Sequence, residues 1–116
     1  MKDIKPKIVK NKNEFFILFP DGIRIEGKTH AETCCLAFQK IGINKVSDFA
    51  SKSSIKRLGF PYVSKIKYDI PSNYKYAEID GYYFIKSISA PNMKKFIESL
   101  SNDLNLGLKV RYIEHK

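Results

Sequence analysis

The stretch EFFILFPDGIRIEGKTHAETCCLAFQKIG, residues 14–42, combines a hairpin signal with a helix signal and decides the expected fold. Asp21-Gly22 separates two apolar runs, and this dipeptide supplies the positive φ angles that a tight turn needs. A two-residue loop would place four apolar side chains on one face, which we expect to be the core face: Phe16, Leu18, Ile23 and Ile25.

A helix is expected directly after this hairpin, over residues 30–41. Thr29 and Glu32 have the spacing of a capping box, in which side-chain oxygens accept hydrogen bonds from the first backbone amides. Apolar residues then recur at helical spacing and predict one buried face: Ala31, Cys34, Cys35 and Phe38. Gly42 is expected to end the helix.

The second half of the chain has the same order of signals. A hairpin over residues 74–88 turns at Asp80-Gly81, and a two-residue turn would place one set of side chains on the same face: Ala77, Ile79, Tyr82 and Phe84. Ser89 and Pro91 are typical of a helix start, and apolar spacing predicts a helix over residues 91–105.

Three further elements complete the expected secondary structure. Apolar spacing after Asn44 predicts a short helix, and alternation over residues 62–68 predicts a strand. Gly107 is expected to end the helix over residues 91–105, and alternation over residues 108–112 predicts a last strand.

These elements predict an α+β fold in the order ββα(α)β-ββαβ. The economical arrangement is a mostly antiparallel sheet with two amphipathic helices on one face. A chain of 116 residues accommodates one domain, expected over residues 14–116 after a basic N-terminal arm, residues 1–13. The two Asp-Gly turns lie 59 positions apart, so a duplicated ββαβ unit is a further interpretation of this order.

Positive charge is the strongest global feature of the sequence. The net charge is +9, of which residues 41–76 contribute +5. Such an excess attracts polyanions. The alternative interpretation is compositional, because the chain is rich in Lys, Asn and Ile and these lysines would then be solvated surface residues.

Tyrosines and basic residues alternate in the middle of the chain. An exposed sheet face of this kind can stack bases on its rings and hold phosphates with its lysines. Tyrosine also favours strands and protein interfaces, so a purely structural role and a protein-binding role stay open. The predicted contacts combine this face with a basic loop: Lys52, Lys56, Arg57, Lys65, Lys67, Lys75, Lys86, Tyr74, Tyr76 and Tyr83.

No catalytic motif is convincing. Asp21, Glu26 and Lys28 resemble the carboxylate and lysine set of metal-dependent nucleases, but an extended strand would hold the two carboxylates roughly 15 Å apart. Adjacent Cys34 and Cys35 lack the partners of a zinc site. We therefore predict no enzyme activity, no metal and no cofactor. The longest apolar run is too short for a membrane span and no signal peptide is evident, so a cytoplasmic protein is expected.

Five segments carry a resemblance to a small bacterial α+β domain: residues 19–22, 41–46, 63–65, 80–83 and 104–110. These segments contain turn, cap and core residues, so the resemblance implies a fold more than a chemistry. Such domains are loosely associated with mobile-element and restriction–modification loci, which implies a DNA-related or host–phage accessory role. The resemblance implies no active-site residues.

The sequence thus predicts a non-catalytic nucleic-acid-binding module, with DNA or RNA as the partner. The alternative is a protein–protein interaction module, such as an accessory subunit or an inhibitor in a bacterial defence or phage system. In that case the tyrosine face or an unpaired sheet edge would make the contact.

Overall fold

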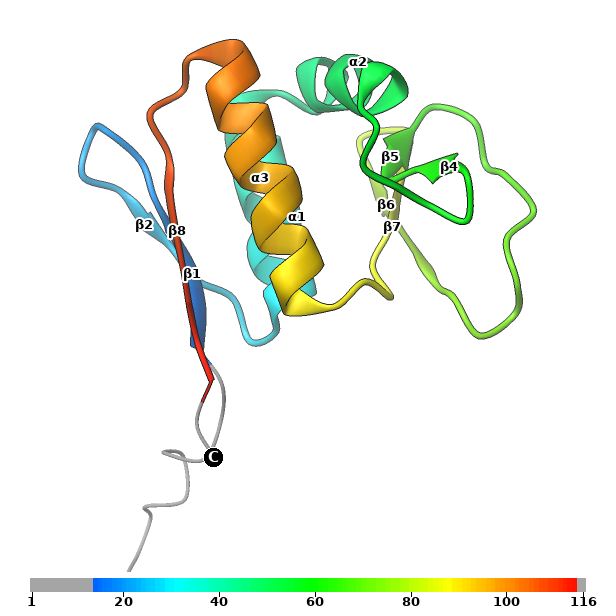
Figure 1. Ribbon diagram of the computed structural model, residues 1–116, viewed down its shortest axis with the longest axis horizontal. Helices are drawn as coiled ribbons and strands as arrows, with labels where there is room; N and C mark the ends of the chain where they lie inside the picture. The colour runs from blue at the N-terminus through cyan, green and yellow to red at the C-terminus, as the bar shows by residue number, and fades with distance from the viewer. Residues whose placement is uncertain (1–13, 115–116) are drawn as a thin grey trace, which may run out of the picture.

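Three layers form the part of the chain that the computed structural model describes, residues 14–114 (Figure 1). Two helices make the middle layer, and an antiparallel sheet lies on each side of it. The expected basic arm, residues 1–13, lies outside the described residues. The α+β class is confirmed, but the strands form separate sheets around the helices instead of one sheet beneath them.

The first sheet has the order β2-β1-β8 and joins the two ends of the described chain. Its strands are β1 (Glu14–Leu18), β2 (Arg24–Ile25) and β8 (Lys109–Ile113). The second sheet has the order β5-β7-β6. Its strands are β5 (Val63–Ser64), β6 (Tyr76–Ile79) and β7 (Tyr82–Ile85). A small hairpin of β3 (Lys56–Arg57) and β4 (Phe60–Pro61) lies beside the second sheet (Figure 1).

The helices agree closely with the sequence-based expectation. The middle layer contains α1 (His30–Ile41) and α3 (Ala90–Leu104), and α2 (Ile43–Lys52) crosses one end of it (Figure 1). Gly42 separates α1 from α2, whereas Asn105 ends α3 with a left-handed φ of 55°. Gly107 was expected in that role; Asn105 takes it because its short amide side chain tolerates this conformation.

Two sheets are possible because both helices have buried residues on two sides. On α1, Thr33 Oγ1 donates to the Phe15 carbonyl in β1, while the Phe38 ring meets Phe84 of β7 with centroids 5.2 Å apart. On α3, Ser101 Oγ accepts a hydrogen bond from the backbone amide of Leu108, just before β8. The Phe96 ring stacks on the Tyr62 ring, with centroids 4.8 Å apart. Five positions along a helix turn its face by about 140°, so each helix presents a hydroxyl to one sheet and a phenyl ring to the other.

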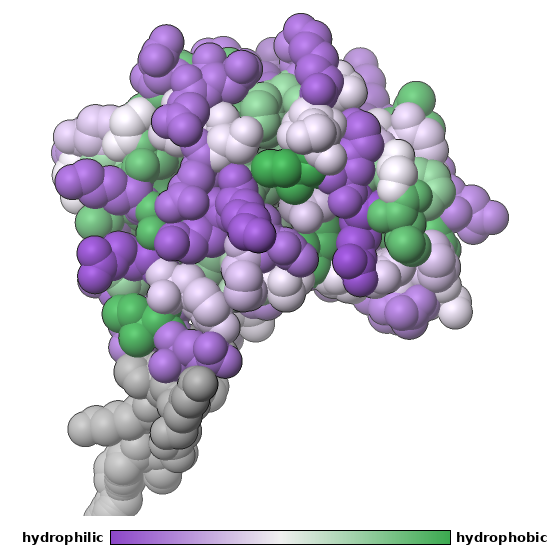
Figure 2. Space-filling view, in the orientation of Figure 1, coloured by the Kyte–Doolittle hydropathy of each residue, from purple (hydrophilic) through white to green (hydrophobic). Residues whose placement is uncertain are grey.

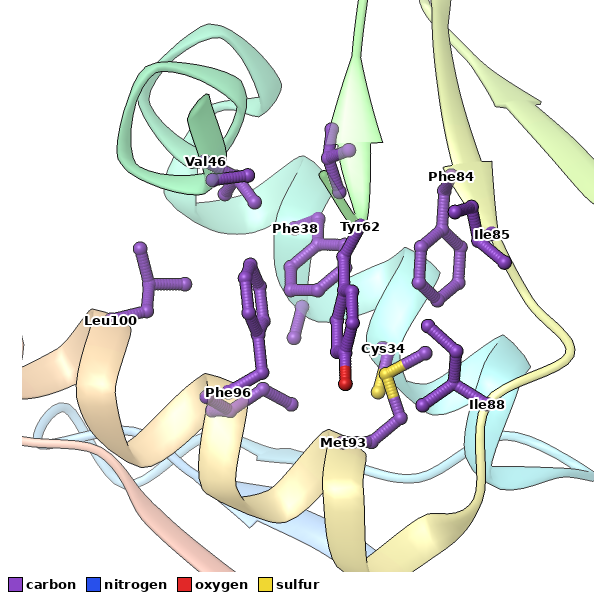
Figure 3. Close-up of a cluster of buried hydrophobic side chains, with 14 of the residues drawn as sticks. Cys34, Phe38, Val46, Tyr62, Phe84, Ile85, Ile88, Met93, Phe96 and Leu100 are labelled. Carbon is purple, nitrogen blue, oxygen red and sulfur yellow. The ribbon is translucent and has the colours of Figure 1, made fainter. Parts of the chain in front are cut away.

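The main core lies between the helices and the second sheet (Figure 3). Phe38, Phe84 and Phe96 are fully buried, and Phe38 contacts both other rings edge-on. Met93 and Cys34 point into the same cluster (Figure 3). Burial raises the pKa of the Cys34 thiol far above neutrality, so it stays protonated and acts as a small apolar group, as expected.

The two halves of the chain pair their strands differently. In the first sheet the central strand is β1, the first strand of its hairpin, whereas in the second sheet it is β7, the second strand of its hairpin. Equivalent strands of a duplicated ββαβ unit would occupy equivalent places. The observed pairing therefore gives the duplication no structural support.

In the first hairpin the expected core face is correct for Ile25, which packs on the core, and wrong for β1 and Ile23. Phe15 and Ile17 are buried, whereas Phe16 and Leu18 are partly exposed and Ile23 is 45% exposed. Ile17 pairs with Ile25, and the Phe19 amide donates to the Ile23 carbonyl, so the loop has three residues instead of two. A change of one residue in register reverses the face of every side chain on the strand.

The second hairpin follows the expectation. Asp80 and Gly81 form a two-residue turn with φ values of 49° and 85°, and Ile79 pairs with Tyr82. Ala77 pairs with Phe84 on the same face, which is the core face. The strand expected over residues 62–68 is much shorter, because only Val63 and Ser64 pair with β7.

Candidate nucleic-acid interface

All ten predicted contact residues lie in residues 52–86, which we call the basic lobe. It contains β3 to β7 and the connection over residues 65–75 (Figure 1). Seven basic and three acidic residues give the lobe a clear positive excess. Figure 2 shows hydrophilic side chains over much of the visible face, with separate hydrophobic patches on the side that holds this lobe.

Arg57 is held in place by hydrogen bonds to Tyr74. Its Nε and Nη2 donate to the Tyr74 hydroxyl at 3.1 and 2.8 Å, and its guanidinium carbon lies 5.2 Å from the centre of the Tyr74 ring. The contact joins β3 to the connection before β6. It holds an exposed cation in one position while leaving other guanidinium N–H groups available to an anion.

Two lysines lie over adjacent tyrosine rings. The ammonium groups of Lys65 and Lys67 are each 5.8 Å from a ring centre, those of Tyr82 and Tyr83 respectively. Successive side chains of a strand point to opposite faces, so these two cations lie on opposite sides of β7. Contacts of this kind contribute about 0.5–1 kcal/mol at exposed sites.

The outer tyrosine face is only partly open. Tyr76 packs edge-on against Tyr83 at 5.7 Å, and its hydroxyl donates to the Tyr68 carbonyl in the connection that covers this face. Burial raises the pKa of the Tyr76 hydroxyl. Tyr74, Tyr76 and Tyr83 therefore contact cations or neighbouring backbone, which limits the ring surface that is open to bases.

Lys75 and Lys86 face each other beyond the ends of β6 and β7. The Lys86 amide donates to the Lys75 carbonyl at 2.9 Å, and the Lys75 amide donates to Ser87 Oγ at 2.8 Å. Like charges directly opposite each other destabilise a sheet. An anion bound between the two ammonium groups would remove that cost.

Lys52 and Lys56 have local roles at the end of α2. Lys52 pairs with Asp48 at 3.2 Å, and Lys56 Nζ donates to the carbonyls of Ala50 and Ser51 at 3.1 and 3.3 Å. A cation at this end of a helix offsets the partial negative charge of the last carbonyls. These two lysines are thus less available to an external anion than the rest of the predicted set.

Most of the cations in the basic lobe have no carboxylate partner. Among residues 14–114, Lys52 is the one basic residue of the lobe in an ion pair, and the other pairs lie outside the lobe. The remaining six basic residues are exposed at the surface: Lys56, Arg57, Lys65, Lys67, Lys75 and Lys86. The structure distributes them around the lobe and does not align them in one stripe.

A second basic surface, which the sequence did not indicate, lies on the outer face of the first sheet. The Arg24 guanidinium lies 3.7 Å from the centre of the Phe16 ring, and Arg111 is the cross-strand partner of Phe16. Lys109 pairs with Leu18 in the same sheet. The alternation of Lys109 and Arg111 predicted a strand, but no local signal placed that strand beside β1.

A pocket of about 450 Å³ was also missed, at the starts of α1 and α3. Lys28, His30, Ser89 and Tyr112 are among its lining residues. His30 Nε2 donates to the Ile88 carbonyl at 2.6 Å, which ties the start of α1 to the segment before α3. The pocket combines residues from distant segments, so sequence spacing gives no indication of it.

The carboxylates of the nuclease-like motif are engaged separately. Asp21 pairs with Lys40 at 3.1 Å, whereas Glu26 pairs with Arg24 at 2.8 Å. Within residues 14–114, no three His, Cys, Asp or Glu side chains are grouped closely enough to hold a metal ion. No helix in that range combines the length and the hydrophobicity needed to cross a bilayer.

Comparison with known proteins adds no assignment to this geometry: no protein-family model, curated protein or solved structure matches the chain.

Proposed function

We propose that the protein binds nucleic acid through the basic lobe, without catalysis. The observation that carries this proposal is the set of six surface cations without carboxylate partners, three of which lie against tyrosine rings. A cation held over a ring loses less conformational entropy when it binds a phosphate than a free lysine does.

The main contacts would be to phosphates. The hydroxyl groups of Tyr74 and Tyr76 are hydrogen-bonded to other residues of the lobe. The ring of the third proposed tyrosine, Tyr83, faces Lys67. Phosphate contacts give affinity that falls steeply with salt and depends weakly on sequence. Because the cations lie on both sides of β7, they suit a nucleic acid that bends or wraps around the lobe better than one that lies flat on a single face.

The test is a fluorescence-anisotropy titration with single-stranded and double-stranded DNA and RNA, at about 50 and 200 mM salt. The informative variant is Lys65→Gln/Lys67→Gln, which removes two ring-held cations from exposed positions. Each lost phosphate contact reduces the slope of log K against log salt by about 0.7–0.9, so we expect a change of about 1.5.

The matched control is Lys45→Gln/Lys95→Gln, which removes the same charge from exposed positions of α2 and α3 outside the basic lobe. We expect this control to keep the wild-type slope. Equal losses in both variants would show that net charge, and not the lobe, drives binding. Absence of binding by the wild type at low salt would contradict the proposal.

A protein-interaction role is the second candidate, because Leu58 and Ile66 are each 58% exposed in the same lobe. Exposed large apolar side chains are typical of contact sites when they occur together. Heparin retention by a monomer would favour nucleic acid. A defined dimer or hetero-complex in gel filtration, without heparin retention, would favour a protein partner.

A further inference from the structure

The turn between β3 and β4 has an unexpected residue at its tip. Arg57 pairs with Phe60, so Leu58 and Gly59 form a two-residue loop with φ values of 53° and 85°. The Asp80-Gly81 turn has nearly the same angles. Asn, Asp or Gly is the usual first residue of such a turn, because a leucine side chain is strained at positive φ.

Packing does not explain this leucine. Leu58 is 58% exposed and is absent from the side chains that pack on the hydrophobic core. A Cβ added at Gly59 would meet no atom within 4 Å, so the tip of the turn is surrounded by open space. Figure 1 shows this green turn beside β4, reaching away from α1 and α3. Strain and exposure without local compensation are typical of a contact made with another molecule.

We propose that Leu58 is an apolar wedge that enters duplex DNA between two base pairs from the minor groove; this inference rests on the nucleic-acid binding proposed above. A two-stranded ribbon is narrow enough to follow a groove, and apolar side chains flanked by basic residues kink duplexes by partial unstacking. Arg57 directly precedes the wedge and is held in place by Tyr74. Its charge, with that of the neighbouring lobe, complements the phosphates beside the kinked step.

A wedge predicts a preference for deformable sequence. Pyrimidine–purine steps such as TpA unstack at low cost, whereas A-tracts are stiff. The protein should therefore bind a duplex with central TpA steps more tightly than an A-tract duplex of the same composition. It should also raise the fluorescence of a 2-aminopurine placed at the TpA step, because unstacking relieves its quenching.

The decisive variant is Leu58→Asn, because asparagine tolerates the left-handed conformation and lacks the apolar side chain. We expect a higher urea midpoint than wild type, roughly tenfold weaker binding to the TpA duplex, and no rise in 2-aminopurine fluorescence. Ile66→Asn is the matched control, since Ile66 is equally exposed in the same lobe but has no positive φ. This control should keep the wild-type preference and the fluorescence rise.

The outcomes separate this inference from the proposed function. Salt-dependent binding by both proteins, with no 2-aminopurine signal and equal affinities for wild type and Leu58→Asn, would overturn the wedge and leave the phosphate contacts intact. Unstacking of duplex RNA but not of DNA would also overturn it, as would a Leu58→Asn defect confined to anionic lipid vesicles. Failure of the wild type to bind any nucleic acid would remove both proposals together.

Discussion

Hairpins β1–β2 and β6–β7 share the dipeptide Asp-Gly and form different turns. In β6–β7 both Asp80 and Gly81 have positive φ, and the loop has two residues. In β1–β2 only the glycine has positive φ, and the loop has three residues, Pro20, Asp21 and Gly22. The Gly22 amide donates to the Phe19 carbonyl at 3.0 Å, which closes a turn around Pro20 and Asp21.

The residue before Asp-Gly accounts for this difference. Pro20 has φ fixed near −65°, which suits the first central position of a type I turn and moves the turn one residue towards the N-terminus. Ile79 imposes no such restriction and stays in its strand. The Asp21 carboxylate then accepts a hydrogen bond from the Ile23 amide at 3.0 Å. This bond, with Lys40, lowers the pKa of Asp21.

The largest predicted effect tests the register that Pro20 sets. Ile17→Ala should lower the free energy of unfolding by about 2–5 kcal/mol, because it opens a cavity in a fully buried site. Leu18→Ala, the neighbouring change on the outer face, should cost clearly less. Urea denaturation of both variants measures the difference. Equal losses, or a larger loss for Leu18→Ala, would mean that the hairpin has the two-residue loop after all.

A smaller effect tests the left-handed residue of the other hairpin. Asp80→Ala should cost about 1–2 kcal/mol, because alanine is strained at φ 49°. Asp80→Asn should cost much less, since asparagine tolerates this conformation. Both variants remove the same charge, so electrostatics cancels from the comparison. Similar midpoints for the two variants in a denaturant titration would contradict the proposed strain.

The smallest effect compares the helices that follow the two hairpins. The Glu32 amide donates to Thr29 Oγ1 at 3.1 Å, whereas the Ser89 side chain makes no capping hydrogen bond to α3. Thr29→Ala should therefore cost about 1 kcal/mol, and Ser89→Ala should be close to neutral. Thermal unfolding of both variants checks this, and a loss at Ser89 as large as that at Thr29 would contradict it.

Local signals predicted most of the secondary structure. The capping residue Thr29 and the stop at Gly42 gave the bounds of α1, and apolar spacing gave those of α3 to within one residue. The division into two sheets was not predictable from such signals. The division depends on which side of each helix a distant strand packs against. The sequences of α1 and α3 indicate which residues are buried, but they do not indicate which strands bury them.

For the candidate site, too, the local sequence indicated the region but not the contacts. The excess of lysines and tyrosines indicated the region, because composition needs no knowledge of pairing. The contacts of Arg57 with Tyr74, and of Lys67 with Tyr83, join residues 16 or 17 positions apart, and one partner of each pair lies in the irregular connection over residues 65–75. The strained backbone of Leu58 was not predictable either. Its turn joins β3 and β4, and each of these strands has only two residues, too few to produce a periodic sequence pattern.

The pairing of β1 with β8 has a consequence for the kinetics of folding. Leu18 pairs with Lys109, whereas Val63 pairs with Phe84 and Ile79 with Tyr82. Closing a longer loop costs more chain entropy, and distant pairings slow the folding of a domain. The second sheet can therefore assemble early from neighbouring residues. The first sheet closes only when segments from the two ends of the described chain meet, which makes β1 with β8 the expected late step of folding.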